Sequence, residues 1–458
     1  MIKFGTDGWR ARIGEDFTFD NVRKVALAHA KVLQRKNLRK IFVGYDHRFL
    51  SEEFAKEVAS VFKVEGFEVF LSSEPCTTPM VSFAIKYLGF DNGVMITASH
   101  NPPEYNGYKI KDSFGGSATV ELVKEVEKEI ERIEKVPKER QKVETLSVKE
   151  SYINKIREFV NLELFSEKES RMVHDAMYGT AAGLLNLALK NTKIEVHSIR
   201  SYRDPLFGGH PPEPVEKYLK PLIEKVRSGD YSLGVANDGD GDRIALVDEK
   251  GSFVNTQMIY VLLLLHLLKH KNIKDGIVVK TVSTTYLADR ICRAFGVKLV
   301  EVPVGFKHIN ELILKEKVIF GGEESGGYGV IHYLPERDGL FSALYIIEML
   351  HLLGKPLSEV IQDIFKEFGT AYYERVDMYA EEDKKQKLKN LIENPPQKLG
   401  SYKVKEVITK DGLKLVFEND GWVLARASGT EPLIRIYAEM PTKEELQQVI
   451  KSMVDIFS

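Results

Sequence analysis

Three things are scarce in this sequence: cysteine, long apolar runs and net charge. Only two cysteines, Cys76 and Cys292, occur among its 458 residues, and they lie far apart. This excludes a disulfide framework of the kind that holds small secreted domains together, and we expect a reducing, cytoplasmic location. The first residues show no apolar leader, so we expect no secretory signal.

No apolar run is long enough to cross a membrane. The longest, Met258–Leu268, is interrupted by His266, whereas a spanning helix needs about 20 apolar residues. This run therefore predicts a buried helix. Charge is almost balanced, with 65 Lys and Arg against 67 Asp and Glu. Nucleic-acid-binding proteins usually show a basic excess, so we expect neither a membrane nor a nucleic acid as partner.

What the sequence does contain is typical of a soluble globular protein, with 43% hydrophobic and 29% charged residues. Its length suits three or four domains. Residues 1–150, 151–252 and 253–368 each alternate strand and helix patterns, which predicts three successive α/β domains with mostly parallel sheets. Residues 369–458 place several strands in succession beside two helices. This last segment predicts a C-terminal α+β domain.

A polar loop follows a short apolar strand pattern at residues 93–96. The loop, residues 97–102, reads Thr-Ala-Ser-His-Asn-Pro and places Ser99 beside His100. The carboxyl end of a strand is where open α/β sheets bind ligands. Serine at such a turn is more often an ordinary turn residue. The chemistry of Ser99 therefore depends on what the other loops supply.

Three aspartates alternate with glycine in a second loop: Asp238, Asp240 and Asp242. The glycines allow a tight turn in which the carboxylates converge, and these repel one another unless a cation lies between them. Oxygen ligands alone favour Mg²⁺, Mn²⁺ or Ca²⁺. The spacing imitates an EF-hand, but Arg243 stands where that loop needs glycine, and residues 244–247 form a strand pattern. The remaining alternative is an Asp/Gly turn without metal.

A cation held by three carboxylates keeps coordination positions for a phosphate, and a third loop is complementary to one. Its phosphate-binding groups are a guanidinium, two hydroxyls and an exposed backbone N–H, from Arg426, Ser428, Thr430 and Gly429. Arg435, on the next strand pattern, adds a second guanidinium. The alternative is an ordinary hairpin loop.

A fourth loop places Glu323 and Ser325 between glycines. A carboxylate that accepts hydrogen bonds and a hydroxyl that donates or accepts them suit the hydroxyl groups of a sugar. The alternative is a solvated turn. Two further cations lie close to these motifs: Arg10, in a glycine-rich turn near the N-terminus, and Lys109, shortly after the serine loop. For each, the alternative is an ordinary surface charge.

Together these loops resemble those of the α-D-phosphohexomutase family, the phosphoglucomutases and phosphomannomutases. The resemblance covers essentially the whole chain, and the Thr-Ala-Ser-His-Asn-Pro and Asp-Gly-Asp-Gly-Asp-Arg motifs are highly specific for this family. The motifs that match in order and separation lie at residues 4–10, 97–102, 238–243, 322–326 and 426–432. The resemblance implies an enzyme with four domains around a central cleft.

The resemblance also implies a role for each residue. Ser99 is the serine that carries phosphate, and the three aspartates bind Mg²⁺ together with that phosphate. Arg10 and Arg243 steady the phosphate, and Lys109 acts as a general acid/base. The residues implied in binding the phosphosugar are Gly305, Glu323, Ser325, Arg337, Arg426, Ser428, Gly429, Thr430 and Arg435.

The implied reaction interconverts hexose 1-phosphate and hexose 6-phosphate through phosphoserine and a hexose 1,6-bisphosphate, which is both intermediate and activator. A small-molecule phosphosugar is the expected partner, and the chain is expected to be a monomer or a homodimer. Gly327 stands where some dual-specificity members carry histidine, so His100 and Lys307 are the candidates for a second acid/base. Glu324 stands where the phosphoglucosamine branch favours glutamine, which makes glucose the expected sugar.

Several alternatives use the same loops. Within the family these are a phosphomannomutase, a dual-specificity enzyme, a phosphoglucosamine mutase and an enzyme that releases the bisphosphate as product. Outside it, a non-catalytic phosphosugar-binding protein or a metallophosphatase would show similar motifs. The presence of Ser99, Lys109 and all three aspartates argues against a non-catalytic role. A phosphatase would have to admit water to its phosphoserine.

Overall fold

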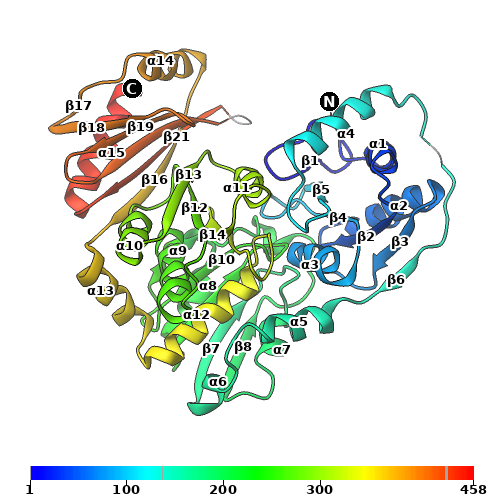
Figure 1. Cartoon of the computed structure of the whole chain (residues 1–458), viewed down its shortest axis with the longest axis horizontal. Helices are drawn as coiled ribbons and strands as arrows, with labels where there is room; N and C mark the ends of the chain where they lie inside the picture. The colour runs from blue at the N-terminus through cyan, green and yellow to red at the C-terminus, as the bar shows by residue number, and fades with distance from the viewer. Residues whose placement is uncertain (1, 137, 429–431) are drawn as a thin grey trace.

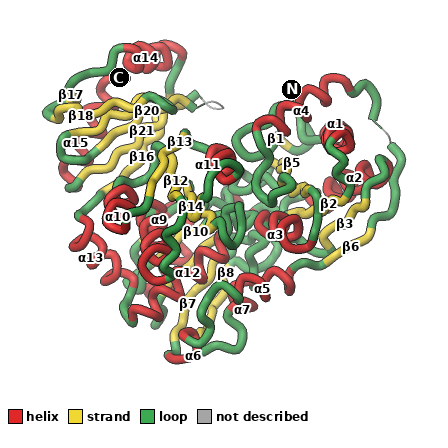
Figure 2. The backbone as a smooth tube through the Cα atoms, viewed as in Figure 1, coloured by secondary structure: helices red, strands yellow, loops and turns green. Residues whose placement is uncertain are grey.

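The computed structural model describes residues 2–136, 138–428 and 432–458. It forms four units in chain order, each built on its own sheet (Figure 1). The first and last units lie on opposite sides of the middle two, and helices flank the strands of every unit (Figure 2). Three α/β units followed by one with an antiparallel sheet confirm the expected fold class.

The first unit has a six-stranded sheet in the order β1-β5-β4-β2-β3-β6. Strands β2, β3, β4 and β6 pair in parallel, and β5 and β1 extend one edge antiparallel. Strand β4 is buried throughout, because helices pack on both faces of the sheet. The elements are β1 (Trp9–Arg12), α1 (Phe19–Arg35), β2 (Lys40–Tyr45), α2 (Ser51–Val64), β3 (Glu68–Ser72), α3 (Thr78–Leu88), β4 (Asn92–Ile96), β5 (Tyr105–Lys111), α4 (Val120–Arg132) and β6 (Glu144–Leu146).

The second unit has a five-stranded sheet in the order β11-β10-β9-β7-β8. Its parallel strands β7, β8 and β9 continue into the antiparallel strands β10 and β11. The metal loop predicted from sequence connects β9 to β10. The elements are α5 (Lys149–Arg157), α6 (Leu164–Glu167), β7 (Ser170–Asp175), α7 (Leu184–Ala188), β8 (Ile194–Ile199), α8 (Lys220–Arg227), β9 (Leu233–Asn237), β10 (Ile244–Val247) and β11 (Phe253–Val254).

The third unit has a four-stranded sheet in the order β13-β12-β14-β15, parallel except for β15. The predicted sugar loop connects β14 to β15. The elements are α9 (Thr256–Leu265), β12 (Ile277–Thr281), α10 (Leu287–Phe295), β13 (Lys298–Val302), α11 (Phe306–Ile313), β14 (Val318–Gly322), β15 (Tyr328–Val330), α12 (Gly339–Leu353) and α13 (Leu357–Phe368).

One apolar core joins the second and third units and reaches helix α3 of the first. The run Met258–Leu268 is buried in it, as predicted: α9 continues into a π-helix over His266–His270. Within the described ranges, no single helix is long and apolar enough to cross a membrane. Helices α12 and α13 together have the length and apolar composition of a membrane span, but they are bent by 82° relative to each other.

The last unit is an antiparallel sheet in the order β16-β21-β20-β19-β18-β17, with α14 and α15 packed against it. Strand β16 follows directly on the third unit and forms one edge of the sheet (Figure 1). The elements are β16 (Tyr372–Tyr379), α14 (Glu382–Glu393), β17 (Lys398–Leu399), β18 (Tyr402–Ile408), β19 (Leu413–Phe417), β20 (Trp422–Ala427), β21 (Leu433–Met440) and α15 (Lys443–Phe457).

Two local expectations are wrong. The pattern over residues 215–227 predicts one helix, but α8 begins only at Lys220, with Pro221 in its first turn, and residues 216–218 form a short 3₁₀ turn. The glycine-rich N-terminal segment is not a turn throughout, because β1 begins at Trp9 and pairs with β5. Strand β5 carries two buried lysines, so its apolar pattern is too weak to predict it.

Candidate active site

Ser99 lies at the carboxyl end of β4 in a strained, buried turn. Its φ of 54° is in the left-handed region, and its side chain is almost fully buried. The Ser99 backbone N–H donates to Thr97 Oγ1 at 2.8 Å, and its carbonyl accepts from Arg48 Nη2 at 2.7 Å. These two bonds hold the serine backbone, so the direction of the Oγ atom is set by the loop itself.

The β9–β10 loop meets the serine loop at very short range. A Cβ atom placed on Gly239 would lie only 2.6 Å from the Ser99 carbonyl oxygen, so glycine is required for this approach. As a result Ser99 Oγ donates a 2.9 Å hydrogen bond to Asp238 Oδ2. Two loops from different units therefore form one site.

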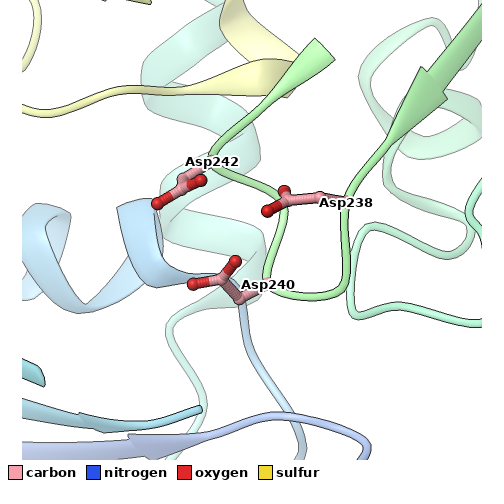
Figure 3. A group of neighbouring side chains, drawn as sticks. All are labelled: Asp238, Asp240 and Asp242. Carbon is pink, nitrogen blue, oxygen red and sulfur yellow. The ribbon is translucent and has the colours of Figure 1, made fainter. Parts of the chain in front are cut away.

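The three aspartates converge as the sequence predicts (Figure 3). One carboxylate oxygen from each lies within 4.8 Å of the others, and all three side chains are fully buried. Asp240 Oδ1 and Asp242 Oδ1 have no hydrogen-bond partner among the described residues. Burial, with repulsion from Asp240 and Asp242, raises the pKa of Asp238 well above its usual range. Buried oxygens short of partners are a fitting ligand set for a hard divalent cation such as Mg²⁺.

Lys109 reaches the aspartate cluster from β5. Its Nζ atom donates to Asp240 at 2.7 Å and Asp242 at 3.1 Å, and forms an ion pair with Asp7 at 2.8 Å. Burial lowers the pKa of Lys109, but the three carboxylates outweigh it, and the net pKa lies well above the usual lysine value. The side chain is therefore a buried ammonium and not the alternative surface charge.

Asp7 is a central member of the site that our sequence reasoning missed. Its carboxylate lies 2.8 Å from Lys109, 2.6 Å from Arg337, 3.7 Å from Lys111 and 3.9 Å from Arg10. These cations outweigh the effect of burial and hold the pKa of Asp7 well below its usual range. Its position in the glycine-rich segment beside Arg10 is the only local signal, since its partners are remote in sequence.

Arg10 contacts the serine loop, and Arg243 contacts the first of the three aspartates. Arg10 Nη1 donates to Asn101 Oδ1 at 2.7 Å, two residues after Ser99. The Arg243 backbone N–H donates to Asp238 Oδ1 at 3.0 Å, and its buried Nε atom has no hydrogen-bond partner in the part of the chain that the structure describes. Both side chains are suited to an anion at Ser99.

His100 lies directly beside the serine hydroxyl. Its Nδ1 atom is 3.3 Å from Ser99 Oγ. Burial, followed by the positive charges of Arg243 and Arg10, lowers the pKa of His100 well below the usual value. The ring is therefore neutral at physiological pH, and its cationic surroundings oppose its protonation. Lys307, the other candidate for a second acid/base, lies half-buried in α11.

The sugar loop is linked to the aspartate cluster through Arg337. Its Nη2 atom lies 2.9 Å from Asp242, and its Nη1 atom 3.7 Å from the buried carboxylate of Glu323. Burial raises the pKa of Glu323 to about 7, although Arg337 opposes the shift. Ser325 is half-buried in the same loop. A Cβ atom on Gly305 would lie 3.7 Å from Thr6, so the loop before α11 also adjoins the N-terminal segment.

The predicted phosphate loop stands on the last unit. Arg426 and Arg435 are direct partners across β20 and β21, so their guanidinium groups share one region of the sheet. Arg426 Nε donates to Asp411 Oδ2 at 2.7 Å. Ser428 is buried, and its backbone N–H donates to the Leu433 carbonyl at 2.8 Å. Gly429 and Thr430 lie outside the described residues.

Four family models match the chain in succession. They describe Phosphoglucomutase/phosphomannomutase alpha/beta/alpha domain I over residues 1–137, domain II over 150–251, domain III over 255–368, and the C-terminal domain over 379–456. A relative from Thermococcus kodakarensis, named "Phosphoglucomutase/phosphomannomutase", is 31% identical and covers 98% of this chain and 96% of its own. One from Methanopyrus kandleri, named "Probable phosphoglucosamine mutase", is 32% identical over 99% and 97% of the two chains.

Solved structures agree with these matches. The crystal structure of a "putative phosphomannomutase" from Thermus thermophilus is 34% identical, has a TM-score of 0.89 and covers 99% of this chain and 98% of its own. The open form of parafusin, a phosphoglucomutase from Paramecium, shares the fold with a TM-score of 0.83 at 21% identity, over 99% and 94% of the two chains.

The four-unit fold and these matches define a class of enzyme, the intramolecular phosphotransferases that act on hexose phosphates. Within that class the chain belongs to the phosphoglucomutase/phosphomannomutase family, the α-D-phosphohexomutases. The family resemblance expected from the loop motifs is confirmed.

Proposed function

We propose that this enzyme interconverts hexose 1-phosphate and hexose 6-phosphate by way of phosphoserine at Ser99. The observation that carries the proposal is the 2.9 Å hydrogen bond from Ser99 Oγ to Asp238 in a buried cluster of carboxylates. A serine in that position can carry a phosphate that completes the coordination of a cation. Phosphoryl transfer depends mainly on positioning and on neutralising charge, which such a site supplies.

Asp238, Asp240 and Asp242 are the residues that would hold Mg²⁺, together with the phosphate on Ser99. When bound, Mg²⁺ neutralises charge on the transferring phosphoryl group. Arg10 and Arg243 are proposed to steady the same phosphate, because Arg10 donates to Asn101 in the serine loop and the Arg243 backbone donates to Asp238. The arginines and the metal ligands together make the serine loop an anion site, although the loop contains no cationic side chain of its own at neutral pH.

Protons are assigned to two groups. In the first transfer the bond between phosphorus and Ser99 Oγ breaks and a bond to the sugar hydroxyl forms, giving the hexose 1,6-bisphosphate. In that step the Lys109 ammonium donates a proton to Ser99 Oγ as it leaves, and a second relay takes the proton of the sugar hydroxyl. In the return transfer the Ser99 hydroxyl attacks the other phosphate, the bond between phosphorus and the sugar oxygen breaks, and Lys109 takes the serine proton. The second relay then returns its proton to the sugar oxygen, and our candidate for it is His100, whose Nδ1 atom is 3.3 Å from Ser99 Oγ. Lys307 remains the alternative second relay.

The substrate is proposed to lie between the sugar loop and the phosphate loop. Glu323 and Ser325 bind its hydroxyls, with Gly305 and Arg337 beside them. Its non-reacting phosphate is held by the phosphate loop, whose proposed contacts are Arg426, Ser428, Gly429, Thr430 and Arg435. Because the bisphosphate must turn end for end between the two transfers, the same loops are proposed to hold it in both orientations, and added bisphosphate is expected to activate unphosphorylated enzyme.

We propose glucose phosphate as the preferred substrate, because the sugar loop carries Glu324 at its middle position. The test compares kcat/KM for glucose 1-phosphate, mannose 1-phosphate and glucosamine 1-phosphate in coupled assays, with glucose 1,6-bisphosphate present. Clear preference for glucose supports the assignment. Comparable values for glucose and mannose would make this a dual-specificity enzyme, and comparable values for all three would contradict any single choice.

A second candidate substrate is glucosamine phosphate. It is favoured by the names of several archaeal relatives, including those from Methanopyrus kandleri and Pyrococcus abyssi, which are 32% and 33% identical. Two adjacent carboxylates, Glu323 and Glu324, are also chemically suited to an amino sugar, because each can accept from an ammonium group. A kcat/KM for glucosamine 1-phosphate at least about tenfold above that for glucose 1-phosphate would replace the first candidate.

The phosphoserine itself is tested by intact mass and peptide mapping. We expect phosphate on Ser99 in the wild type, and no turnover in a Ser99→Ala variant even with added bisphosphate. The exposed Ser166→Ala variant is the matched control and should keep full activity. An active Ser99→Ala enzyme would overturn the proposal, and sustained release of inorganic phosphate would instead identify a phosphatase.

A further inference from the structure

Asp411 joins the last unit to the third at a single oxygen atom. It lies in the turn between β18 and β19, and its Oδ2 atom accepts from Arg426 Nε at 2.7 Å. The same atom accepts from the backbone N–H of Val304 at 2.9 Å. Val304 immediately precedes Gly305, in the loop that leads into α11. One carboxylate oxygen thus connects an arginine of the phosphate loop with the backbone of the loop beside the sugar site.

The turn that carries Asp411 is built against the Arg426 backbone. Gly412 has a φ of 108°, and a Cβ atom there would lie 2.4 Å from the Ala425 carbonyl oxygen and 3.1 Å from Arg426 Cα. Only glycine permits this approach without moving one strand. Next to it, Lys410 Nζ donates to the Glu301 carbonyl of the third unit at 3.0 Å. The position of Asp411 is therefore determined by backbone packing on one side and by an interunit bond on the other.

The hydrogen bond to Asp411 uses the Nε atom of the Arg426 guanidinium, and this affects how the group can bind an anion. A guanidinium presents two edges to oxygen anions, one of which includes Nε. Engaging Nε fixes the plane of the group, and with it the direction of the edge formed by the two terminal nitrogens. The hydrogen bond to Asp411 also raises the pKa of Arg426 against the effect of burial, so the charge is retained.

We propose that Asp411 is a positioning residue that orients Arg426 for the non-reacting phosphate of the substrate and sets its distance from the Gly305 loop. The inference rests on the proposed function, in which Arg426 binds that phosphate. Asp411 itself does not touch the substrate. Its carboxylate would only repel a phosphate dianion if it were placed directly against it.

The experiment is a double-mutant cycle in the full-length enzyme with the hexose phosphate that the wild type turns over best. We expect Asp411→Ala to raise KM about tenfold or more, in keeping with loss of a charge-assisted hydrogen bond, with kcat changed less than about twofold. Arg426→Ala should raise KM at least as much. The combined variant should show the KM of Arg426→Ala alone, because Asp411 acts through that arginine.

Asp420→Asn is the matched control. Asp420 lies in the next hairpin turn of the same sheet, and its side chain contacts only the exposed Lys405 among its described partners. The KM of Asp420→Asn should equal that of the wild type. Asp411→Asn, which keeps an oxygen for Val304 but loses the charge, should give an intermediate KM. Additive effects of Asp411→Ala and Arg426→Ala on KM would overturn the proposal. A loss of kcat together with a lower melting temperature would also overturn it, because Asp411 would then act through the stability of the fold.

Failure of the proposed function would look different. If the wild type turned over no hexose phosphate, the function itself would be wrong, whereas a wild type with full turnover and an unchanged KM in Asp411→Ala would refute only the role of Asp411. Binding of hexose 6-phosphate, measured by calorimetry, provides a second readout. Equal affinity of the wild type and Asp411→Ala for hexose 6-phosphate would also contradict the positioning role of Asp411.

Discussion

The Ser99 hydroxyl donates a 2.9 Å hydrogen bond to Asp238, 139 residues further along the chain. This contact joins the strand end of the first α/β unit to the aspartate loop of the second. It is possible because Gly239 lets the two backbones approach, and because the serine carbonyl is held from behind by Arg48. The packing of buried charges around this contact has measurable consequences for metal binding, catalysis and pH dependence.

Asp238→Asn should leave the metal-free protein at least as stable as the wild type while removing its response to Mg²⁺. Burial and the two neighbouring aspartates disfavour a charged Asp238, so a neutral isostere relieves that cost. Melting temperatures measured with and without Mg²⁺ provide the test. We expect the wild type to rise by several degrees with saturating metal and the variant by less than about one. The exposed Asp230→Asn should respond like the wild type, and a full Mg²⁺ response in Asp238→Asn would contradict the site.

Lys109→Met should be both inactive and unstable without metal. Removing the ammonium takes away the cation that Asp7, Asp240 and Asp242 share. Arg337 still pairs with Asp7 and Asp242, but Asp240 loses its ion pair, at a cost of about 3–5 kcal/mol in the free energy of unfolding. Mg²⁺ should restore part of that loss, and kcat should fall at least about a hundredfold. Urea unfolding and steady-state assays measure both effects. The exposed Lys128→Met is the control, and unchanged kcat in a folded Lys109→Met variant would remove Lys109 from the mechanism.

Glu323 should make substrate binding weaker below neutral pH. Burial raises its pKa to about 7, so the carboxylate that accepts sugar hydroxyls is present above pH 7 and is lost as the pH falls through that value. We expect KM to rise about tenfold per unit of pH below 7 in the wild type. Glu323→Gln should have a higher KM at every pH, and its KM should not show this additional rise below pH 7. Both enzymes share the ionisation of the substrate phosphate, so only the difference between their profiles is diagnostic. Parallel profiles of KM against pH for the wild type and Glu323→Gln would contradict the role of Glu323. The control is the exposed Glu316→Gln, whose KM profile should match that of the wild type.

His29 should make the protein sensitive to acid. Burial lowers the pKa of His29 to about 3, opposed weakly by the nearby Asn92 side chain. Between the ordinary histidine value of 6.5 and about 3, the unfolded chain binds a proton that the folded chain does not, so stability falls as the pH drops below 6.5. His29→Gln removes this contribution. When the pH is lowered from 7.5 to 5.5, the free energy of unfolding of His29→Gln should rise by about 1.4 kcal/mol relative to that of the wild type.

Urea titrations at the two pH values measure that relative change. Gln keeps a group able to bond the Tyr108 hydroxyl, which lies 3.0 Å from His29 Nδ1. The exposed His210→Gln should show the same pH dependence as the wild type. A constant difference between wild type and His29→Gln at the two pH values would show that His29 is protonated in the folded state as well.

Local patterns were enough to predict the fold class and the convergence of the three aspartates. Strand β4 begins one residue before the apolar pattern at residues 93–96 and ends with it, because a strand covered on both faces is a short continuous apolar segment. The aspartate triad is likewise local, since three carboxylates in five residues converge once glycine makes the turn. Strand β5 escaped prediction because its buried lysines interrupt the apolar pattern.

The sequence by itself determined the fold class and the family, and it located the loops in which we place the chemistry, because those depend on periodicity and on residues adjacent in the chain. Only the tertiary structure decided which remote groups complete each loop. Asp7 meets Arg337 across 330 residues, and Asp411 meets Val304 across 107. The physical reason is that buried charges need partners wherever packing brings them, and the packing of four units is not a property of any local stretch of sequence.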